Sequence, residues 1–216
     1  MKIAVAGGTG TVGHHVVDVV RERGHDPIVL ARSTGVDLVT GAGVAGALEG
    51  VDTVIDVASV QTLSDAASRD FFGAVTRSLL AAEVAAGVRH HVALSIVGVD
   101  DAPHSYYAGK VLQEELVAAG PVPWTILCAT QFHEFAGQIF DTAKVGPLVL
   151  VPRMRSQPVA AREVAERLVA LAVGERGPVV GEVEPGQLPG IVVPERFDEV
   201  AADRILDHGR DDGVAA

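Results

Sequence analysis

The chain has 216 residues, 48% hydrophobic and only 4% aromatic, so it is long enough to bury a full core built mainly from aliphatic side chains. Its 17 basic and 28 acidic residues give a formal net charge of −11, which argues against nucleic acid and anionic membrane surfaces as main partners. A single cysteine, Cys128, excludes an internal disulfide, and no apolar run approaches the roughly 20 residues that span a bilayer. We therefore expect a soluble, cytoplasmic protein. Its alanine-rich helix faces leave both a monomer and a homodimer open.

Short apolar runs alternate with helical patterns through the first 130 residues. The runs predict strands at 3–6, 27–31, 54–58, 91–96 and 124–128, and the patterns predict helices at 12–20, 44–49, 72–86 and 105–119. This rhythm is typical of a Rossmann-type α/β fold with a doubly wound parallel sheet. Since the strands are continuously apolar, both sheet faces should be buried. Gly24, Gly87 and Gly120 each follow a helical pattern, where a left-handed cap is expected.

The rhythm loosens after Thr130. We expect a helix at 135–143, a strand at 148–151, a helix at 162–173 and a final strand and helix. No repeat or low-complexity linker separates these segments from the rest. We therefore predict one domain over residues 1–216, with a dinucleotide-binding core at about 1–130 and a small C-terminal cap on the substrate side at about 131–216.

Four glycines lie in seven residues directly after the first strand. Gly7, Gly10 and Gly13 fit a G-x-x-G-x-x-G spacing, while Gly8, Gly10 and Gly13 fit G-x-G-x-x-G. Both spacings give a tight turn, close approach of a pyrophosphate and close packing of the following helix, whose free N–H groups attract phosphate. The alternative is a glycine-rich turn without a ligand. The expected contact residues are Gly7, Thr9, Gly10, Thr11 and Val12.

The end of the second strand bears on the choice of nucleotide. An NAD site commonly has an acidic residue here for the ribose hydroxyls, whereas an NADP site has a cation near the 2′-phosphate. Arg32 and Ser33 stand at this place, and no carboxylate follows until Asp37. Since a guanidinium binds phosphate bidentately, NADP is favoured and NAD stays open. A solvated loop arginine without a ligand is the alternative.

A second group of polar residues follows the fourth strand. Ser95 ends this strand, and Tyr106 and Lys110 are one helical turn apart on one helix face. An ammonium at this spacing is expected to lower the pKa of the Tyr106 phenol, which then exchanges a proton with a substrate oxygen that Ser95 orients. Lys110 is also expected to hold the nicotinamide ribose. The alternative is a Tyr/Lys pair that only shapes the cofactor pocket.

No metal site is expected. His90 and His91 are adjacent at the start of a strand, so their side chains should point to opposite sheet faces and cannot share an ion. No cluster of His, Cys and Asp has the spacing of a zinc site, and one cysteine does not support a thiolate site.

Five motifs together resemble a known family. They are GGTGTVG at 7–13, DTVIDVAS at 52–59, SIVG at 95–98, YYAGK at 106–110 and QFHEF at 131–135, and QPVAAREVA at 157–165 adds to them. The chain resembles the atypical or extended short-chain dehydrogenase/reductases of the NmrA-like, NAD(P)H-binding group. The resemblance implies that Ala58 and Ser59 line the ribose side of the cofactor. It also implies that Thr130, Gln131 and Phe132 wall the nicotinamide and substrate pocket.

These observations favour an NADP-dependent oxidoreductase that transfers a hydride to a carbonyl, a quinone or a related unsaturated small molecule. Members of the resembling group differ in whether they use the Tyr/Lys pair, so a non-catalytic NAD(P)-sensing regulatory protein is one alternative. An isomerase or dehydratase that retains its nucleotide is another. The identity of the substrate does not follow from the sequence, because its pocket walls come from the last third of the chain.

Overall fold

The computed structural model describes residues 1–134, 144–145, 148–149, 158–174 and 191–192. Its elements, in chain order, are β1 (Lys2–Ala6), α1 (Gly13–Glu22), β2 (Asp26–Leu30), the 3₁₀ helix η1 (Arg32–Thr34), α2 (Val44–Ala47), β3 (Thr53–Asp56), α3 (Asp65–Ala86), β4 (His90–Ile96), the 3₁₀ helix η2 (Val99–Asp101), α4 (Tyr106–Ala118), β5 (Trp124–Ala129), β6 (Lys144–Val145), β7 (Leu148–Val149), α6 (Ala161–Ala172) and β8 (Ile191–Val192).

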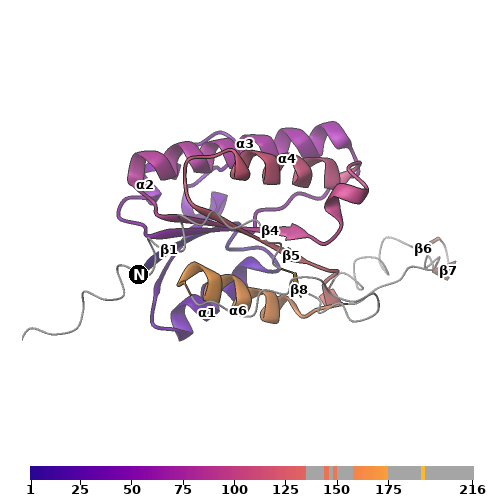
Figure 1. Ribbon diagram of the computed structural model, residues 1–216. Helices are drawn as coiled ribbons and strands as arrows, with labels where there is room; N and C mark the ends of the chain where they lie inside the picture. Colours follow the sequence, from indigo (N-terminus) through magenta and orange to yellow (C-terminus); the bar gives the residue numbers. More distant parts are fainter. Residues whose placement is uncertain (135–143, 146–147, 150–157, 175–190, 193–216) are drawn as a thin grey trace, which may run out of the picture.

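The sheet confirms the Rossmann-type prediction. Its strand order is β2-β1-β3-β4-β5-β8, and the first five strands are mutually parallel, whereas β8 pairs antiparallel with β5. Helices α2, α3 and α4 cover one face and α1 and α6 the other (Figure 1). Strand β2 lies on one side of β1, and β3, the next strand in the chain, lies on the other side of β1. The direction in which successive strands are added therefore reverses at β1. This reversal makes the boundary between β1 and β3 the expected place for a ligand.

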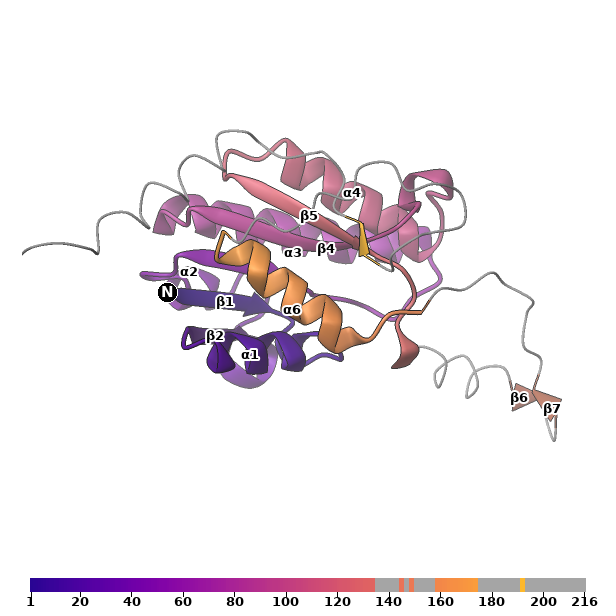
Figure 2. The ribbon, with the colours of Figure 1, turned by 60° about the horizontal axis from the view of Figure 1, so that its bottom comes forward.

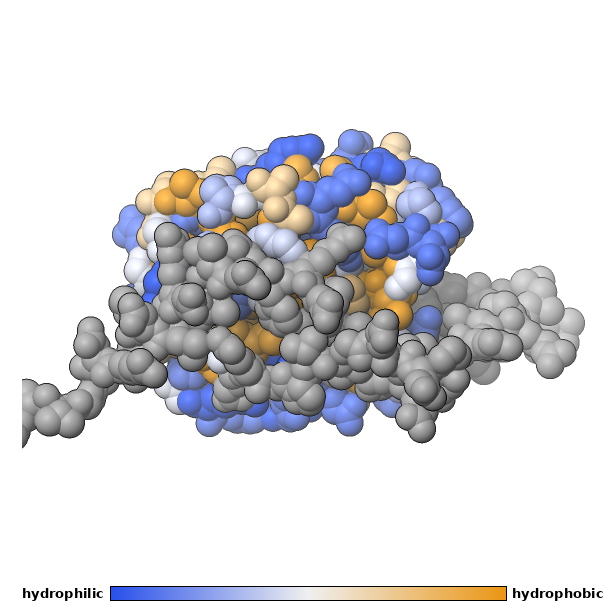
Figure 3. Space-filling view, viewed as in Figure 1, coloured by the Kyte–Doolittle hydropathy of each residue, from blue (hydrophilic) through white to orange (hydrophobic). Residues whose placement is uncertain are grey.

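Each sheet face has its own apolar core. On one face Val5 packs in a cluster with Val16 of α1 and with Val164 and Leu168 of α6, the two helices that lie side by side across the sheet in Figure 2. Both faces are therefore covered, as the continuously apolar strands predict. In the space-filling view, the visible hydrophobic residues form separate patches, one of them at the upper left, and hydrophilic residues line the lower rim (Figure 3).

The opposite face is packed by α2 and α3. Ala4 and Val54 of the sheet are buried there with Leu48, which follows α2, and with Val75 and Leu79 of α3. The predicted apolar stripe of the third helix therefore faces the sheet. The helix itself is longer than this stripe, because the Ser64 hydroxyl accepts a hydrogen bond from Ala67 N (3.3 Å) and caps it at Asp65.

Helix α6 corrects the predicted division into core and cap. It was expected among the cap elements of the last third, yet it lies beside α1 in the layer under the sheet. Most of its apolar residues are buried in the same cluster as those of α1, and Arg162 donates a hydrogen bond to Glu22 at the end of α1 (3.1 Å from Nη1 to Oε1). Residues 161–172 thus belong to the dinucleotide-binding fold. The rest of the cap, including the helix expected at 135–143 and the final helix, lies outside the described residues.

Two other boundaries differ from the sequence prediction. Strand β3 ends at Asp56 and not at residue 58, because the Asp56 carboxylate accepts a hydrogen bond from Ala58 N (2.9 Å) and turns the chain out of the sheet.

Gly24 and Gly87 have the expected left-handed φ values of +77° and +71°. The same expectation was wrong for Gly120, since α4 already ends at Ala118 and its cap, Ala119, is right-handed.

The two adjacent histidines of β4 face opposite sides of the sheet, as expected. His90 Nε2 is 2.9 Å from Thr125 Oγ1 on the neighbouring strand, and His91 Nδ1 is 2.8 Å from Glu83 Oε1 on α3. Burial lowers the pKa of His90 to about 4. Burial also disfavours a charged His91, but the carboxylates of Glu83 and Asp56 together outweigh this effect and the pKa of His91 is raised. No helix among the described residues has the length and apolarity that a membrane crossing requires.

His90 should make the fold sensitive to acid. Its pKa is about 4 in the folded state and about 6.5 in an unfolded chain, so the unfolded state binds the extra proton first as the pH falls between these values. The resulting loss is about 3 kcal/mol of unfolding free energy, whereas the raised pKa of His91 acts in the opposite direction. We expect His90→Asn to lose less stability than the wild type between pH 7 and pH 4 in urea unfolding. Parallel stability curves for the two proteins would contradict this expectation.

Candidate functional site

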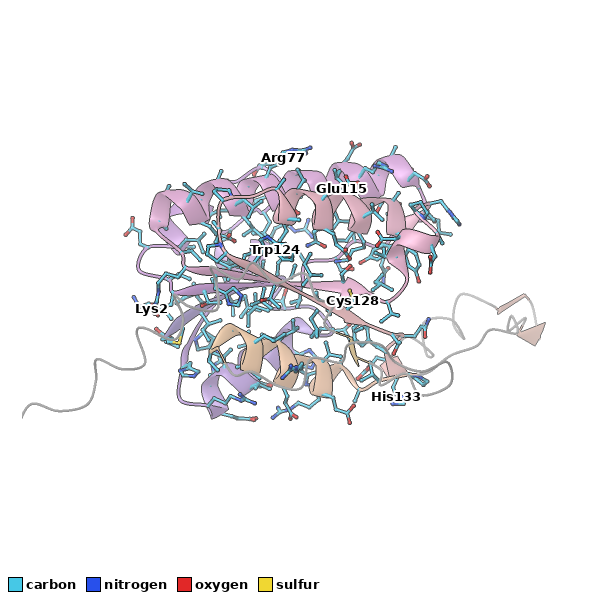
Figure 4. The ribbon with its side chains drawn as sticks, in the orientation of Figure 1. Lys2, Arg77, Glu115, Trp124, Cys128 and His133 are labelled. Atoms are coloured by element: carbon cyan, nitrogen blue, oxygen red, sulfur yellow. The ribbon has the colours of Figure 1, made fainter. Side chains whose placement is uncertain are left out.

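The candidate site lies at the carboxyl ends of the parallel strands. The segments that follow β1, β2, β3 and β5 all leave the sheet at this edge, and they contain the residues predicted for cofactor binding apart from Lys110, which is on α4. Figure 4 shows His133, just after β5, at this end of the molecule and Lys2, at the start of β1, at the opposite end. The sheet topology therefore gathers sequence-distant candidates at one edge.

Two glycines of the first loop are required by the fold itself. Gly7 has φ +78°, and a Cβ on it would lie 2.8 Å from the Cα of Ala58, which follows β3. A Cβ on Gly13 would lie 2.1 Å from the carbonyl oxygen of Gly7. Both distances are far below van der Waals contact. The glycines therefore let the loop, the start of α1 and the end of β3 come together at the reversal of strand order.

Gly10 is different, because little in the chain requires it. It is exposed at the loop tip between Thr9 and Thr11, and an added Cβ would meet only Gly7 O, at 3.3 Å. Helix α1 starts just beyond it with no side-chain cap and no acidic residue in its first turn. The N-terminal N–H groups of such a helix attract an anion. The loop therefore fits the pyrophosphate of a dinucleotide, which would approach the backbone where Gly10 carries no side chain.

The turn after β2 presents Arg32 and Ser33 to solvent. The Thr34 hydroxyl accepts from Ala31 N (3.2 Å) and donates to Val29 O (2.8 Å), which fixes the turn while both preceding side chains stay exposed. The next carboxylate is engaged elsewhere: Asp37 Oδ1 accepts from the backbone N–H groups of the two residues 39 and 40, at 2.9 and 3.2 Å. The positive Arg32 is thus the charged side chain presented at this strand end.

Ala58 and Ser59 follow β3 directly beside the glycine loop. Ala58 is buried against Gly7, and Ser59 is exposed at the edge. Their position is set by the buried Asp56 carboxylate, whose Oδ1 accepts the Ala58 N–H. The structure therefore brings Gly7, Ala58 and Ser59 together, as a shared cofactor site requires.

Tyr106 is joined to this strand end by its hydroxyl. The distance from Tyr106 Oη to Ser59 Oγ is 2.9 Å, and the Tyr106 ring packs edge-on against Phe72 with 5.4 Å between ring centroids. Burial raises the pKa of Tyr106, an effect that the Ser59 hydrogen bond only partly opposes. The expectation that Lys110 lowers this pKa is therefore wrong. At neutral pH Tyr106 is a protonated phenol, the form that can donate a proton.

The backbone before Tyr106 is strained and held from two sides. Ser105 has φ +58°, a conformation that L-residues rarely adopt, and it is the one non-glycine residue with positive φ in the described part of the chain. Asp65 Oδ1 accepts from Ser105 N at 2.6 Å, and Ser105 Oγ donates to Leu63 O at 2.8 Å. The segment after β3 thus fixes the start of α4, and with it the direction of the Tyr106 side chain.

The glycine within the YYAGK motif has a packing role. A Cβ on Gly109 would lie 2.3 Å from Ser68 Oγ and 2.6 Å from Phe72 Cδ2, both on α3. Its absence lets α3 and α4 touch, and Ser68 Oγ then donates to the Tyr106 carbonyl at 2.7 Å. Close helix contact therefore supports the position of Tyr106.

Lys110 faces the sheet and not the Tyr106 hydroxyl. Its Nζ donates to Leu94 O (2.5 Å) and to Gln113 Oε1, and it lies 4.7 Å from the centre of the Phe72 ring. Burial lowers the pKa of Lys110 to about 8, although the Asp56 carboxylate opposes this change. The spacing of four residues does place Tyr106 and Lys110 on one helix face, yet each has its own hydrogen-bond partners.

Ser95 is also placed differently from the expectation. Its hydroxyl donates to Glu114 Oε1 on α4, and the side chain is buried, with 2% of its surface exposed. The structure pairs the Tyr106 hydroxyl with Ser59 instead. Register explains the difference: Ser95 is on the sheet face under α4, whereas Ser59 lies beyond the end of its strand and is exposed at the edge.

Thr130, Gln131 and Phe132 come directly after β5 at the same edge. Phe132 forms an isolated parallel bridge with Val159, with Val159 N donating to Gln131 O (2.9 Å) and His133 N donating to Val159 O (3.1 Å). This pairing ties the segment to the residues just before α6, and Phe132 packs on the core under the sheet. These residues therefore border the site from the side of β5.

The sequence analysis missed several residues that build the site. Gln113, Asp65 and Ser68 lie outside the quoted motifs, and Asp56 lies in the DTVIDVAS motif without having been given a role; each acts through a hydrogen bond to a residue far away in the sequence. One signal was available: Asp56 is a charged residue inside the apolar run 54–58, where a carboxylate needs buried partners.

Two curated proteins are similar to this chain. Over 222 aligned residues the chain is 28% identical to the photosystem II assembly factor Ycf39 of Synechocystis. This alignment covers 91% of this chain and 68% of Ycf39. Over 139 residues it is 33% identical to a (4-alkanoyl-5-oxo-2,5-dihydrofuran-3-yl)methyl phosphate reductase of Streptomyces griseus. This alignment covers 58% of this chain and 46% of the reductase. The chain thus spans less than half the length of that reductase.

Solved structures agree on the fold. A short-chain dehydrogenase/reductase superfamily protein from Agrobacterium tumefaciens with bound NAD is 28% identical, with a TM-score of 0.50 over 62% of this chain and 50% of that chain. A UDP-N-acetylglucosamine 4-epimerase from Bacillus cereus is 22% identical, with a TM-score of 0.62 over 81% of this chain and 75% of that chain. A family model described as NAD(P)H-binding matches residues 7–173. With a match that extends from the glycine loop to the end of α6, the chain belongs to this NAD(P)H-binding family, and its likeness to the short-chain dehydrogenase/reductases is confirmed.

Proposed function

We propose that the protein is an NADPH-dependent reductase that transfers a hydride to a carbonyl, a quinone or a related unsaturated small molecule. The observation that carries the proposal is the position of Tyr106. Its protonated hydroxyl is bonded to Ser59, beside the glycine loop, at the strand edge where the dinucleotide site of this family lies. The 33% identity to a reductase supports the same class of reaction.

A nicotinamide dinucleotide, when bound at this edge, would supply the hydride for the electrophilic carbon of the substrate. Tyr106 donates its phenolic proton to the substrate oxygen as negative charge develops there, so that the product is an alcohol or its enol equivalent. Ser59 is exposed and hydrogen bonded to the same phenol, so it passes a proton from water back to Tyr106. A raised pKa suits this direction, since the phenol is already protonated at neutral pH.

The charged side chains that follow β2 support a preference for NADPH over NADH. Arg32 is exposed at the end of β2, where the 2′-phosphate of NADP is expected, and the nearby Asp37 carboxylate is occupied by its own turn. A guanidinium pairs with phosphate by two parallel hydrogen bonds.

A second candidate function is a nucleotide-binding regulatory protein without turnover. Lys110 and Ser95, which the sequence hypothesis combines with Tyr106 in catalysis, both have internal partners in this chain. A relative that is named an assembly factor is consistent with this alternative. It predicts nucleotide binding with no consumption of NADPH by any carbonyl or quinone.

Reversal of the charge at Arg32 should change the nucleotide preference. We expect Arg32→Glu to weaken NADPH binding about 100-fold, because a carboxylate repels the 2′-phosphate, and to change NADH binding less than about threefold. The measurement is a titration that follows nicotinamide fluorescence. Arg77→Glu is the matched control, since Arg77 is exposed on the outer side of α3, away from the sheet (Figure 4). Tighter binding of NADH than of NADPH by the wild type would contradict the NADP assignment.

Removal of the Tyr106 hydroxyl should abolish most of the turnover. We expect Tyr106→Phe to lower kcat about 10²- to 10⁴-fold on any substrate found in an aldehyde and quinone panel, with unchanged nucleotide affinity, because only the proton donor is lost. Because the pKa of Tyr106 is raised, its phenol should cause no loss of rate between about pH 6 and pH 9. Tyr107→Phe is the control on the neighbouring residue. If Tyr106→Phe retained the wild-type kcat, Tyr106 would not be the proton donor.

A further inference from the structure

Three buried side chains form a hydrogen-bonded line between β3 and α4. Lys110 Nζ donates to Gln113 Oε1, and Gln113 Nε2 donates to Asp56 Oδ2 at 2.7 Å. The other carboxylate oxygen, Asp56 Oδ1, accepts the Ala58 N–H at 2.9 Å. We name Lys110, Gln113 and Asp56 the relay. One end of the relay is the lysine one turn after Tyr106, and the other end is the turn that presents Ser59.

The relay is closed to solvent. The exposed fractions of Asp56, Gln113 and Lys110 are 0%, 1% and 4%. A buried charge is costly unless it is paired and fully hydrogen bonded, and here the amide of Gln113 connects the ammonium to the carboxylate. The remaining hydrogen-bond partner of Lys110 is Leu94 O, on β4. Each hydrogen bond of the relay therefore requires a donor on one side chain and an acceptor on the next.

The direction of the relay is fixed by its two charged ends. An ammonium can only donate and a carboxylate can only accept, so the amide of Gln113 must turn its oxygen to Lys110 and its nitrogen to Asp56. An asparagine at position 56 would break this order. Its single oxygen could accept from Ala58 N or from Gln113, but not from both, and its NH₂ group would then face another donor.

Asp56 also controls Ser59, which is the partner of the Tyr106 hydroxyl. The Asp56–Ala58 hydrogen bond ends β3 and starts the segment that carries Ser59 and, further along, Asp65, which holds Ser105 N. A single buried carboxylate is therefore connected to both sides of Tyr106: to Ser59 through the turn and to Lys110 through Gln113.

We propose that Asp56 is a positioning residue, which acts through Gln113 on Lys110 and through Ala58 on Ser59 to hold the ribose side of the nucleotide site and the proton donor Tyr106 in place. The proposal rests on the proposed function. It assigns Asp56 and Gln113 no contact with substrate or nucleotide. Its specific content is the polarity of the relay, which makes positions 56 and 113 interdependent.

The test uses a swap of charge within the relay. In Asp56→Asn one hydrogen bond of the relay is lost, and in Gln113→Glu two carboxylates face each other at hydrogen-bond distance. The double variant D56N/Q113E restores the order: the asparagine oxygen accepts from Ala58 N, its NH₂ group donates to Glu at position 113, and this new carboxylate accepts from Lys110. The net charge of the double variant equals that of the wild type.

Two measurements on the full chain test the exchange of charge between positions 56 and 113. The first is the dissociation constant for NADPH from nicotinamide fluorescence, and the second is the urea midpoint of the ligand-free protein. We expect each single variant to weaken NADPH binding about tenfold or more and to lower the urea midpoint. We expect the double variant to bind NADPH within about threefold of the wild type and to recover the midpoint.

Glu83→Gln is the matched control, because Glu83 is an equally buried carboxylate that pairs with His91 outside the relay. We expect it to lower the urea midpoint without changing NADPH affinity, which separates a positioning effect from a general loss of stability. If a single variant does not fold, recovery of folding in the double variant supports the relay, and a double variant that also fails to fold overturns it.

The failures of the two proposals are distinguishable. If the wild type binds NADPH and the single variants bind it equally well, the positioning role of Asp56 is overturned and the proposed function stands. Additive losses in the double variant overturn the relay as well. If the wild type binds neither NADPH nor NADH, the proposed function fails and the positioning role fails with it, while the urea midpoints still report whether positions 56 and 113 are coupled.

Discussion

The contact between three backbone segments at the carboxyl end of β1 is the constraint on which the rest of the site depends. Gly7, Gly13 and Ala58 approach one another so closely that a Cβ on either glycine would overlap main-chain atoms. This contact joins the start of α1 to the end of β3 where the strand order reverses. It thereby sets the uncapped N-terminus of α1, the exposed tip at Gly10 and the Ser59 turn beside one another. The proposed phosphate and ribose contacts, and the position of Tyr106 beside them, all depend on this geometry.

The chemistry beside this contact depends on burial and on direction. Tyr106 and Lys110 share a helix face, but the phenol reaches outward to Ser59 while the ammonium reaches inward to Leu94 O and Gln113. Burial then raises the pKa of the phenol and lowers that of the ammonium. A phenol that stays protonated suits a proton donor in a reduction. The lysine, in contrast, contributes by holding β4 and α4 together beside the site.

Most of the fold could be predicted from the sequence, because the signals are periodic and local. Apolar runs located the five parallel strands, and the glycine spacing located the loop whose geometry the structure confirms. Opposite orientation of His90 and His91 followed from strand alternation alone. The family model matches residues 7–173, the span that contains all the motifs quoted from the sequence.

The electrostatics of the site could not be predicted in the same way. The partner of a side chain depends on register and rotamer, so the sequence could not distinguish Ser95, which turns under α4 to Glu114, from Ser59, which lies beyond its strand. Long-range partners such as Asp56 and Gln113 are 57 residues apart and share no motif. Helix α6 was misplaced for a related reason: its apolar stripe indicates a buried face, and only the packing against α1 shows which layer covers it.

The central claim is that the loop tip at Gly10 receives the phosphates of a dinucleotide, and a titration with NADPH tests it most directly. Gly10→Ala adds one methyl group whose only neighbour in the chain within 4 Å is Gly7 O, at 3.3 Å, and Gly46→Ala adds the same group at an exposed position of α2, where no atom lies within 4 Å. We predict that the wild type and Gly46→Ala bind NADPH equally, and that Gly10→Ala binds it at least about tenfold more weakly with an unchanged unfolding midpoint, because the methyl group occupies the phosphate position. Equal binding by Gly10→Ala, or no binding of NADPH or NADH by the wild type, would contradict the account.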